Sequence, residues 1–133
     1  MASTRDGRSA AAPARGSRAE LGAAGEQAAA ELLMAKGHEV LDRNWRCARG
    51  ELDLVTRDGP WLVATEVKTR RSLRSGHPLE AIDPAKLARL RRLAGLWRAA
   101  HPEARGRLRI DAVSVVVREG APPELRHVEG IGA

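Results

Sequence analysis

Two short stretches decide the fold: Gly50-Glu51-Leu52-Asp53-Leu54-Val55 and, after a turn, Val63-Ala64-Thr65-Glu66-Val67-Lys68. Each is an apolar run typical of a buried strand, and each carries charges that are costly to bury unless they are used or paired. Side chains two residues apart share one face of a strand, so Glu66 and Lys68 should point the same way. The intervening dipeptide Asp58-Gly59 predicts a hairpin with these two residues at its turn.

This hairpin would bring two carboxylates together. With that turn, Arg57 would face Pro60, and Asp53 would lie diagonally across from Glu66 on the same face. Diagonal neighbours on paired strands are roughly 7–8 Å apart, so the two carboxylates could hold one divalent cation. Lys68 would then stand beside the ion and its bound water, an arrangement suited to cutting phosphodiesters. The alternative is an ordinary solvated strand face, which the same short pattern also permits.

Lysine usage favours a role for Lys68. The chain has 23 basic residues, and only Lys36, Lys68 and Lys86 are lysine. A compact ammonium differs chemically from a planar guanidinium, so a chain that uses arginine almost everywhere has kept lysine where that difference matters.

Composition limits the class of protein. A chain of 133 residues predicts one domain with a modest core, at residues 18–133, preceded by a disordered basic tail at 1–17. A net charge of +6 indicates a polyanionic partner, most commonly nucleic acid. The single cysteine, Cys47, excludes an internal disulfide and favours a reducing, cytoplasmic compartment. No apolar run approaches the roughly 18 residues of a membrane span, so no membrane interaction is expected.

Hydrophobic periodicity predicts two helices and five strands. The helices are expected from Arg18 to Lys36 and from Asp83-Pro84 to Ala100, and the strands at 38–46, 51–57, 61–69, 107–118 and 124–128. A basic loop at 70–78 precedes the second helix. The order α-β-β-β-α-β-β predicts an α/β fold whose mixed central sheet is antiparallel at first, parallel across the second helix, and flanked by helices.

Glu26 departs from the pattern of the first helix. The apolar stripe of that helix is predicted at Leu21, Ala24, Ala28, Leu32 and Ala35. Glu26 lies outside both this stripe and the polar side, on a flank of small residues where it could approach the sheet. An exposed boundary glutamate is the alternative.

Lys86 departs from the pattern of the second helix. It stands one turn ahead of Leu90, at the head of the stripe predicted to be buried on that helix, which consists of Leu90, Leu93, Ala94 and Trp97. Such a lysine either extends outward to solvent or reaches a site at the helix N-terminus, where phosphate is also favoured. The second interpretation is preferred.

Arginines near these positions are candidate phosphate contacts. Three of them, Arg70, Arg71 and Arg74, follow Lys68 in the basic loop, and Arg43 and Arg46 flank Trp45. The alternative is ordinary solvated arginines.

Two other side chains are expected to be structural. Trp45 is interpreted as core rather than as a stacking platform. Asp111, among the valines of the long fourth strand, is expected to pair with an arginine, although Arg109 is too near in sequence for that role to be assumed.

Several motifs in one order resemble a known family. They are Gly25-Glu26, Arg43-Asn44-Trp45-Arg46, Gly50-Glu51-Leu52-Asp53-Leu54, Glu66-Val67-Lys68-Thr69-Arg70, Gly76-x-Pro78, Lys86 with Arg89-Leu90, and Arg109-Ile110-Asp111. This series, from about Leu21 to His127, is similar to the bacterial YraN-like proteins. That family looks like a branch of the PD-(D/E)XK nucleases, similar to archaeal Holliday-junction resolvases.

The resemblance implies a restriction-endonuclease-like core and a metal-dependent endonuclease. It implies that Glu26, Asp53 and Glu66 bind Mg²⁺ or Mn²⁺ and that Lys68 and Lys86 complete the catalytic set. The expected substrate is nucleic acid. DNA is favoured over RNA, and branched or damaged DNA structures are candidate substrates. Cutting a symmetric four-way junction would call for a homodimer. Two alternatives remain open: a nucleic-acid-binding module without activity, and a partner-binding scaffold.

Overall fold

The computed structural model describes residues 18–71 and 82–132, so the predicted tail at 1–17 and most of the predicted basic loop, including Arg74, lie outside it. The elements are α1 (Arg18–Ala35), β1 (Glu39–Cys47), β2 (Gly50–Asp58), β3 (Trp61–Arg70), α2 (Pro84–Ala100), β4 (Arg107–Val116) and β5 (Glu124–Val128). The predicted order α-β-β-β-α-β-β is confirmed. Within the described ranges no helix is long and apolar enough to cross a lipid bilayer.

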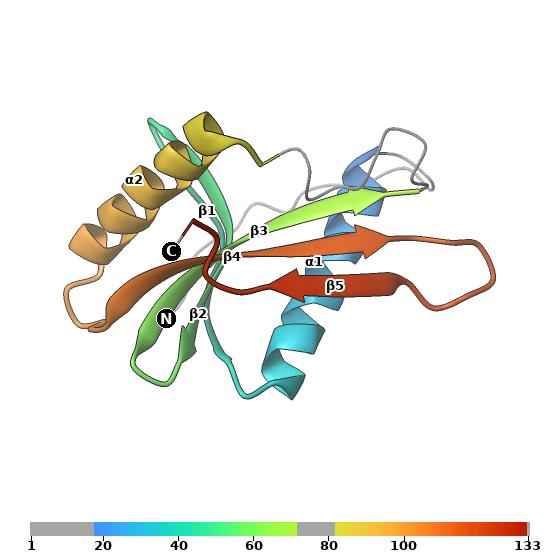
Figure 1. The fold of residues 1–133 in the computed structure, drawn as a ribbon, viewed down its shortest axis with the longest axis horizontal. Helices are drawn as coiled ribbons and strands as arrows, with labels where there is room; N and C mark the ends of the chain where they lie inside the picture. Colours follow the sequence, from blue (N-terminus) through green and yellow to red (C-terminus); the bar gives the residue numbers. More distant parts are fainter. Residues whose placement is uncertain (1–17, 72–81, 133) are drawn as a thin grey trace, which may run out of the picture.

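The five strands form one mixed sheet in the order β1-β2-β3-β4-β5 (Figure 1). The first three strands pair antiparallel, β3 and β4 pair parallel because α2 carries the chain across, and β5 returns antiparallel to β4. This pairing matches the predicted sheet. The central strand of the five is β3, which carries Glu66 and Lys68.

The predicted turn of the β2–β3 hairpin was wrong by one position. Asp58 pairs with Trp61, so the two turn residues are Gly59 and Pro60. Pro60 has no backbone N–H and cannot close a two-residue turn as the residue that follows it. Gly59, with φ of +60°, occupies the first turn position instead.

This correction changes the geometry of the acidic residues. The β2–β3 register runs from Asp58 opposite Trp61 to Leu54 opposite Thr65. The paired residues end there, and a regular continuation would set Asp53 opposite Glu66 rather than diagonal to it.

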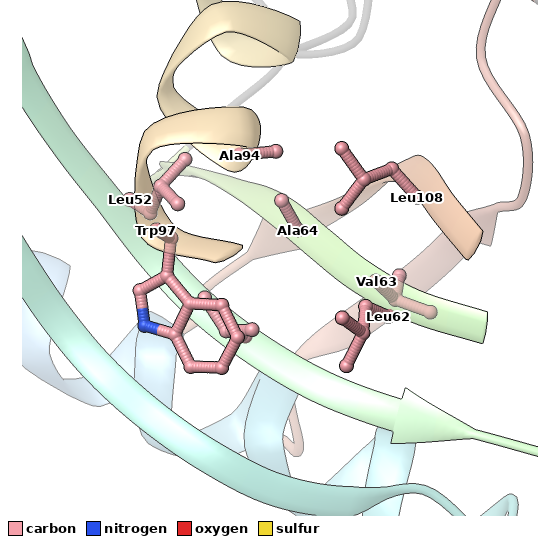
Figure 2. A pocket seen from close by; sticks show the side chains of 8 residues that line it. Leu52, Leu62, Val63, Ala64, Ala94, Trp97 and Leu108 are labelled. Atoms are coloured by element: carbon pink, nitrogen blue, oxygen red, sulfur yellow. The ribbon is translucent and has the colours of Figure 1, made fainter. Parts of the chain in front are cut away.

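The two helices cover different faces of the sheet with separate apolar cores. The predicted buried stripe of α2 packs on Leu52, Leu62 and Ile110, while α1 packs on Leu54, Val113 and Val115. Figure 1 shows α1 passing behind the strands. Figure 2 shows the packing under α2, where side chains such as Trp97, Ala64 and Leu108 surround a narrow hollow. This apolar gap leaves no room for a water molecule, so it is part of the core and not a binding site.

The predicted stripe of α1 was wrong at two positions, because Ala24 and Ala35 are exposed. The residues of this helix that are buried are Gly25, Ala29, Ala30 and Leu33. The helix is turned toward its smallest residues because they allow the closest approach to the sheet. That rotation carries the flank of Glu26 toward β3.

Asp111 is fully buried on β4 and does pair with an arginine. The partner is Arg109, whose Nε lies 2.9 Å from Oδ1 of Asp111, because side chains two residues apart on a strand share a face. His127 Nε2 and the backbone N–H of Gly130 also contact this carboxylate. These hydrogen bonds satisfy the buried charge, and they tie β4 to the chain on both sides of Val128.

Candidate functional site

The candidate site lies where β2 and β3 stop pairing. Beyond Leu54 and Thr65 the pairing ends, and Asp53 Oδ2 accepts a hydrogen bond of 2.8 Å from the backbone N–H of Val67. The carboxylate of Asp53 therefore takes the place of a strand partner. The backbone N–H of Val67 thus holds this carboxylate against β3.

The strand alternation is interrupted at the same point. Leu52 and Leu54 are two residues apart and would share a face of a regular strand, yet Leu52 packs in the α2 core and Leu54 in the α1 core. On the neighbouring strand β1, Asn44 has a left-handed backbone with φ of +52°. Such local irregularities in a sheet re-aim side chains, and this one lies at Asp53.

Helix α2 delivers a lysine to this point. Asp83 caps the helix by accepting from the backbone N–H of Lys86 at 2.8 Å, and Pro84 occupies the first turn. Lys86 Nζ lies 2.7 Å from Glu66 Oε2, and the two side chains are only 20% and 12% exposed. Lys86 thus reaches inward from the helix N-terminus and does not extend to solvent.

Negative charge accumulates around Asp53. Burial, followed by the neighbouring carboxylate of Glu66, raises the pKa of Asp53 to about 7, against the lowering effect of the Val67 N–H. Burial also raises the pKa of Glu26, and Glu51 and Glu66 add to that effect while a hydrogen bond with Asn44 opposes it. Several carboxylates therefore compete for one partly desolvated region.

Lys68 experiences the opposite effect. Burial lowers the pKa of its ammonium, and the nearby charge of Lys86 lowers it further, while Glu66 acts in the other direction. Lys68, Lys86 and Glu66 are thus electrostatic neighbours at the end of β3. A lysine with a lowered pKa exchanges protons more readily near neutral pH than an ordinary one.

Two hollows flank the end of β3. The first, of about 320 Å³, is lined by Asp53, Glu66 and Lys86 together with Arg49 and Arg89; we call it the acidic hollow. The second, of about 590 Å³, lies between the start of α1 and the end of β3. Its polar lining consists of Arg18, Glu26, Lys68, Thr69 and Arg70, and we call it the α1 hollow.

The structure therefore divides the five candidate catalytic residues between two adjacent spaces. Asp53, Glu66 and Lys86 line the acidic hollow, and Glu26 and Lys68 line the α1 hollow. No cluster of three or more acidic, histidine or cysteine side chains able to hold a metal occurs in residues 18–71 and 82–132. The carboxylates that line the acidic hollow are those of Glu51, Asp53 and Glu66, with Glu26 on the neighbouring side, and Glu51 is paired with Arg46.

The candidate arginines have different surroundings. Arg70 lines the α1 hollow, and Arg71 is exposed directly after it. Arg43 donates to Gln27 Oε1 on α1 at 2.8 Å, and Arg46 Nε lies 3.2 Å from Glu51 Oε1.

Sequence reasoning missed Arg18 and Arg89 as lining residues. The spacing of three residues between Lys86 and Arg89 on one helix was the available signal for Arg89. For Arg18, the sequence carried no comparable signal.

The comparisons with known proteins follow the same residues. Positions 25–115, from Gly25 before Glu26 into β4, match the sequence model of the uncharacterised protein family UPF0102. This chain belongs to the UPF0102 family. The family is the YraN family that the motifs predicted, so that prediction is confirmed.

Relatives from several bacteria match over nearly their full length. The chain is 53% identical over 113 residues to the UPF0102 protein of Renibacterium salmoninarum, which covers 85% of this chain and 96% of the relative. It is 54% identical over 112 residues to that of Kineococcus radiotolerans, with coverage of 84% and 92%. The UPF0102 protein of Mycolicibacterium vanbaalenii is 48% identical over 115 residues, with coverage of 86% and 95%.

Proposed function

We propose that this protein is a metal-dependent endonuclease that hydrolyses phosphodiester bonds in DNA. The observation that carries the proposal is the pair of carboxylates from Asp53 and Glu66, fixed side by side on β2 and β3, with two lysines at the same strand end. The net charge of +6 and the resemblance to PD-(D/E)XK nucleases agree with it.

The donor set suits Mg²⁺ or Mn²⁺. Mg²⁺ binds oxygen ligands, keeps several of its waters, and commonly uses only one or two protein carboxylates beside substrate phosphates. Asp53 and Glu66 would hold the ion, and Glu26 is the candidate for a third, water-bridged ligand. Burial and then repulsion by Glu66 raise the pKa of Asp53, and a bound cation would favour its charged form. When bound, such an ion lowers the pKa of a coordinated water and offsets the charge on the scissile phosphate.

The two lysines supply positive charge beside the two carboxylates. Lys68 would orient the attacking water and offset charge on the phosphate, and its lowered pKa would ease loss of its own proton. Lys86 brings a positive charge beside Glu66, where it can balance the charge of a phosphate in the acidic hollow. Arg49 and Arg89 line the same hollow and would hold the neighbouring phosphates.

One observation favours a second candidate, a nucleic-acid-binding module without activity. Lys86 already pairs with Glu66 at 2.7 Å, so a protein cation neutralises one of the two proposed metal ligands. In a binding module this ion pair would be permanent, and the basic surface would serve binding alone.

The deciding experiment incubates labelled duplex, single-stranded, flap and four-way-junction DNA with Mg²⁺, Mn²⁺ or EDTA. The wild type should cut in a metal-dependent way, and Asp53→Asn and Glu66→Gln should lose at least about 100-fold in rate because they remove an anionic ligand. The matched control Glu31→Gln changes an exposed carboxylate on α1 and should cut normally. Absence of cutting with either metal, with unchanged DNA binding by all variants, would favour the binding module. Preference for the junction would call for a test of two-fold dimerisation.

A further inference from the structure

A third hollow lies beside the acidic hollow, on the outer side of the turn between β1 and β2. It has a volume of about 390 Å³, and its lining is Trp45, Cys47, Ala48, Arg49, Arg92 and Leu96. We call it the tryptophan hollow. The lining is mostly apolar, and Leu96 on its wall is 39% exposed.

The tryptophan hollow continues the acidic hollow along one side of α2. Arg49 lines both hollows. On the helix, Lys86 and Arg89 line the acidic hollow, and Arg92 and Leu96 line the tryptophan hollow, so the lining residues follow one another at spacings of three and four. Residues at these spacings occupy one face of a helix. The face therefore leads without interruption from the proposed cleavage site to the tryptophan hollow.

The lining combines the groups that bind an unpaired base. An indole offers a flat apolar surface, and a guanidinium stacks on a base plane while attracting the adjoining phosphate. Trp45 is half-buried: it packs against the α2 core and also lines the hollow. The core thus holds the ring in place, and the ring needs no ordering when a ligand stacks on it.

We propose that the tryptophan hollow binds one unpaired nucleobase of the strand whose phosphate lies in the acidic hollow. This inference rests on the proposed function and specifies its substrate class. A base stacked inside a duplex cannot enter a protein hollow unless it is unstacked or flipped. Substrates with single-stranded or branched segments should therefore be preferred over intact duplex. Two flanking arginines and continuity with the acidic hollow favour a base over the apolar side chain of a partner protein.

The test separates base contacts from phosphate contacts. Affinities are measured in EDTA for oligothymidylate and for an abasic oligomer of the same length, which keeps every phosphate and lacks the bases. One stacked base should make the wild type prefer oligothymidylate by between about fivefold and 150-fold. Leu96→Glu should abolish this preference, since it places a negative charge in the hollow. The matched control Met34→Glu, at a position 43% exposed on α1 and outside all three hollows, should retain it.

The outcomes separate this inference from the proposed function. Equal, salt-sensitive affinity of the wild type for both oligomers would overturn the base hollow and leave the nuclease proposal intact. A side chain of a partner protein would then be the favoured occupant of the tryptophan hollow. A preference that survives Leu96→Glu would place the base elsewhere and also overturn the inference. Failure to bind either oligomer, with duplex or junction DNA still bound, would overturn the base hollow alone, and failure to bind any of these DNAs would overturn the proposed function as well.

Discussion

The buried histidine His38 shows how this fold handles charge away from the candidate site. Its Nδ1 lies 2.8 Å from Thr56 Oγ1, and its Nε2 lies 3.5 Å from Asp58 Oδ2. Burial lowers the pKa of His38 below its usual 6.5, although the carboxylates of Asp58 and Asp111 act in the other direction. Desolvation therefore prevails over the nearby acids, and the folded protein holds this imidazole neutral.

His38 should make the protein less stable in mild acid. The unfolded chain binds a proton at His38 below about pH 6.5, and the folded chain resists it, so stability is complete above that pH and falls as the pH drops toward the folded pKa. The loss cannot exceed about 1.4 kcal/mol per pH unit for one proton. Urea unfolding at pH 7.5, 6.5 and 5.5 measures it as the difference between the wild type and a His38 variant, because the raised pKa of Asp53 acts in the opposite direction.

The control for this residue is a pair of variants. His38→Gln removes the titrating group and should flatten the loss between pH 6.5 and 5.5, whereas His101→Gln, at the C-cap of α2, should leave it in place. If wild type and His38→Gln lose the same free energy of unfolding over this range, His38 is not the group responsible.

At the scale of elements, the approach of α1 to β3 decides where Glu26 lies. The two elements touch at Gly25, where a Cβ atom would overlap the side chain of Thr69. Thr69 follows Lys68 on β3, so this contact brings the proposed ligand of α1 and the proposed lysine of β3 to one hollow. A larger residue at position 25 would push the helix outward and separate them.

Gly25→Ala should therefore destabilise the fold. Overpacking at such a contact costs about 1–3 kcal/mol, which exceeds the roughly 0.5–1 kcal/mol that alanine gains over glycine inside a helix. Gly22→Ala is the matched control, since a Cβ there meets nothing within 4 Å and should stabilise the helix slightly. Denaturant unfolding of both variants measures the difference, and Gly25→Ala at least as stable as Gly22→Ala would contradict the close contact.

For the whole molecule, the net charge of +6 predicts DNA binding that weakens steeply with salt. We expect the DNA backbone to pass along the α1 hollow, because Arg18 and Arg70 line it. Each phosphate contact adds about 0.9 to the slope of log affinity against log salt. Arg18→Ala and Arg70→Ala should each reduce the magnitude of that slope by about that amount.

Arg118 provides the matched control for the salt series. It forms an exposed ion pair with Glu124 at 2.8 Å, between β4 and β5, and it lines none of the three hollows. Arg118→Ala should leave the slope unchanged. An equal reduction in all three variants would mean that net charge alone, and no particular path, governs binding.

The sequence predicted the elements well because they depend on local patterns. Apolar runs at 51–57 and 61–69, and the Asp83-Pro84 start of α2, identify their strands and helix without knowledge of neighbours. The buried stripe of α2 was correct because large side chains define it. The predicted stripe of α1 was wrong at two positions because most residues of this helix are small. Small residues differ little in hydrophobicity, yet they differ greatly in how closely they let the helix approach the sheet.

By itself, the sequence determined the family, the order of elements, the mixed sheet and the candidate acids and lysines, since these follow from residue types and short spacings. Only the tertiary structure decided how those groups meet. It set the β2–β3 register through the Gly59-Pro60 turn, joined Lys86 to Glu66, and divided the site between two hollows. The physical reason is that register, helix rotation and the burial of charge depend on contacts between residues distant in the chain, which local patterns do not encode.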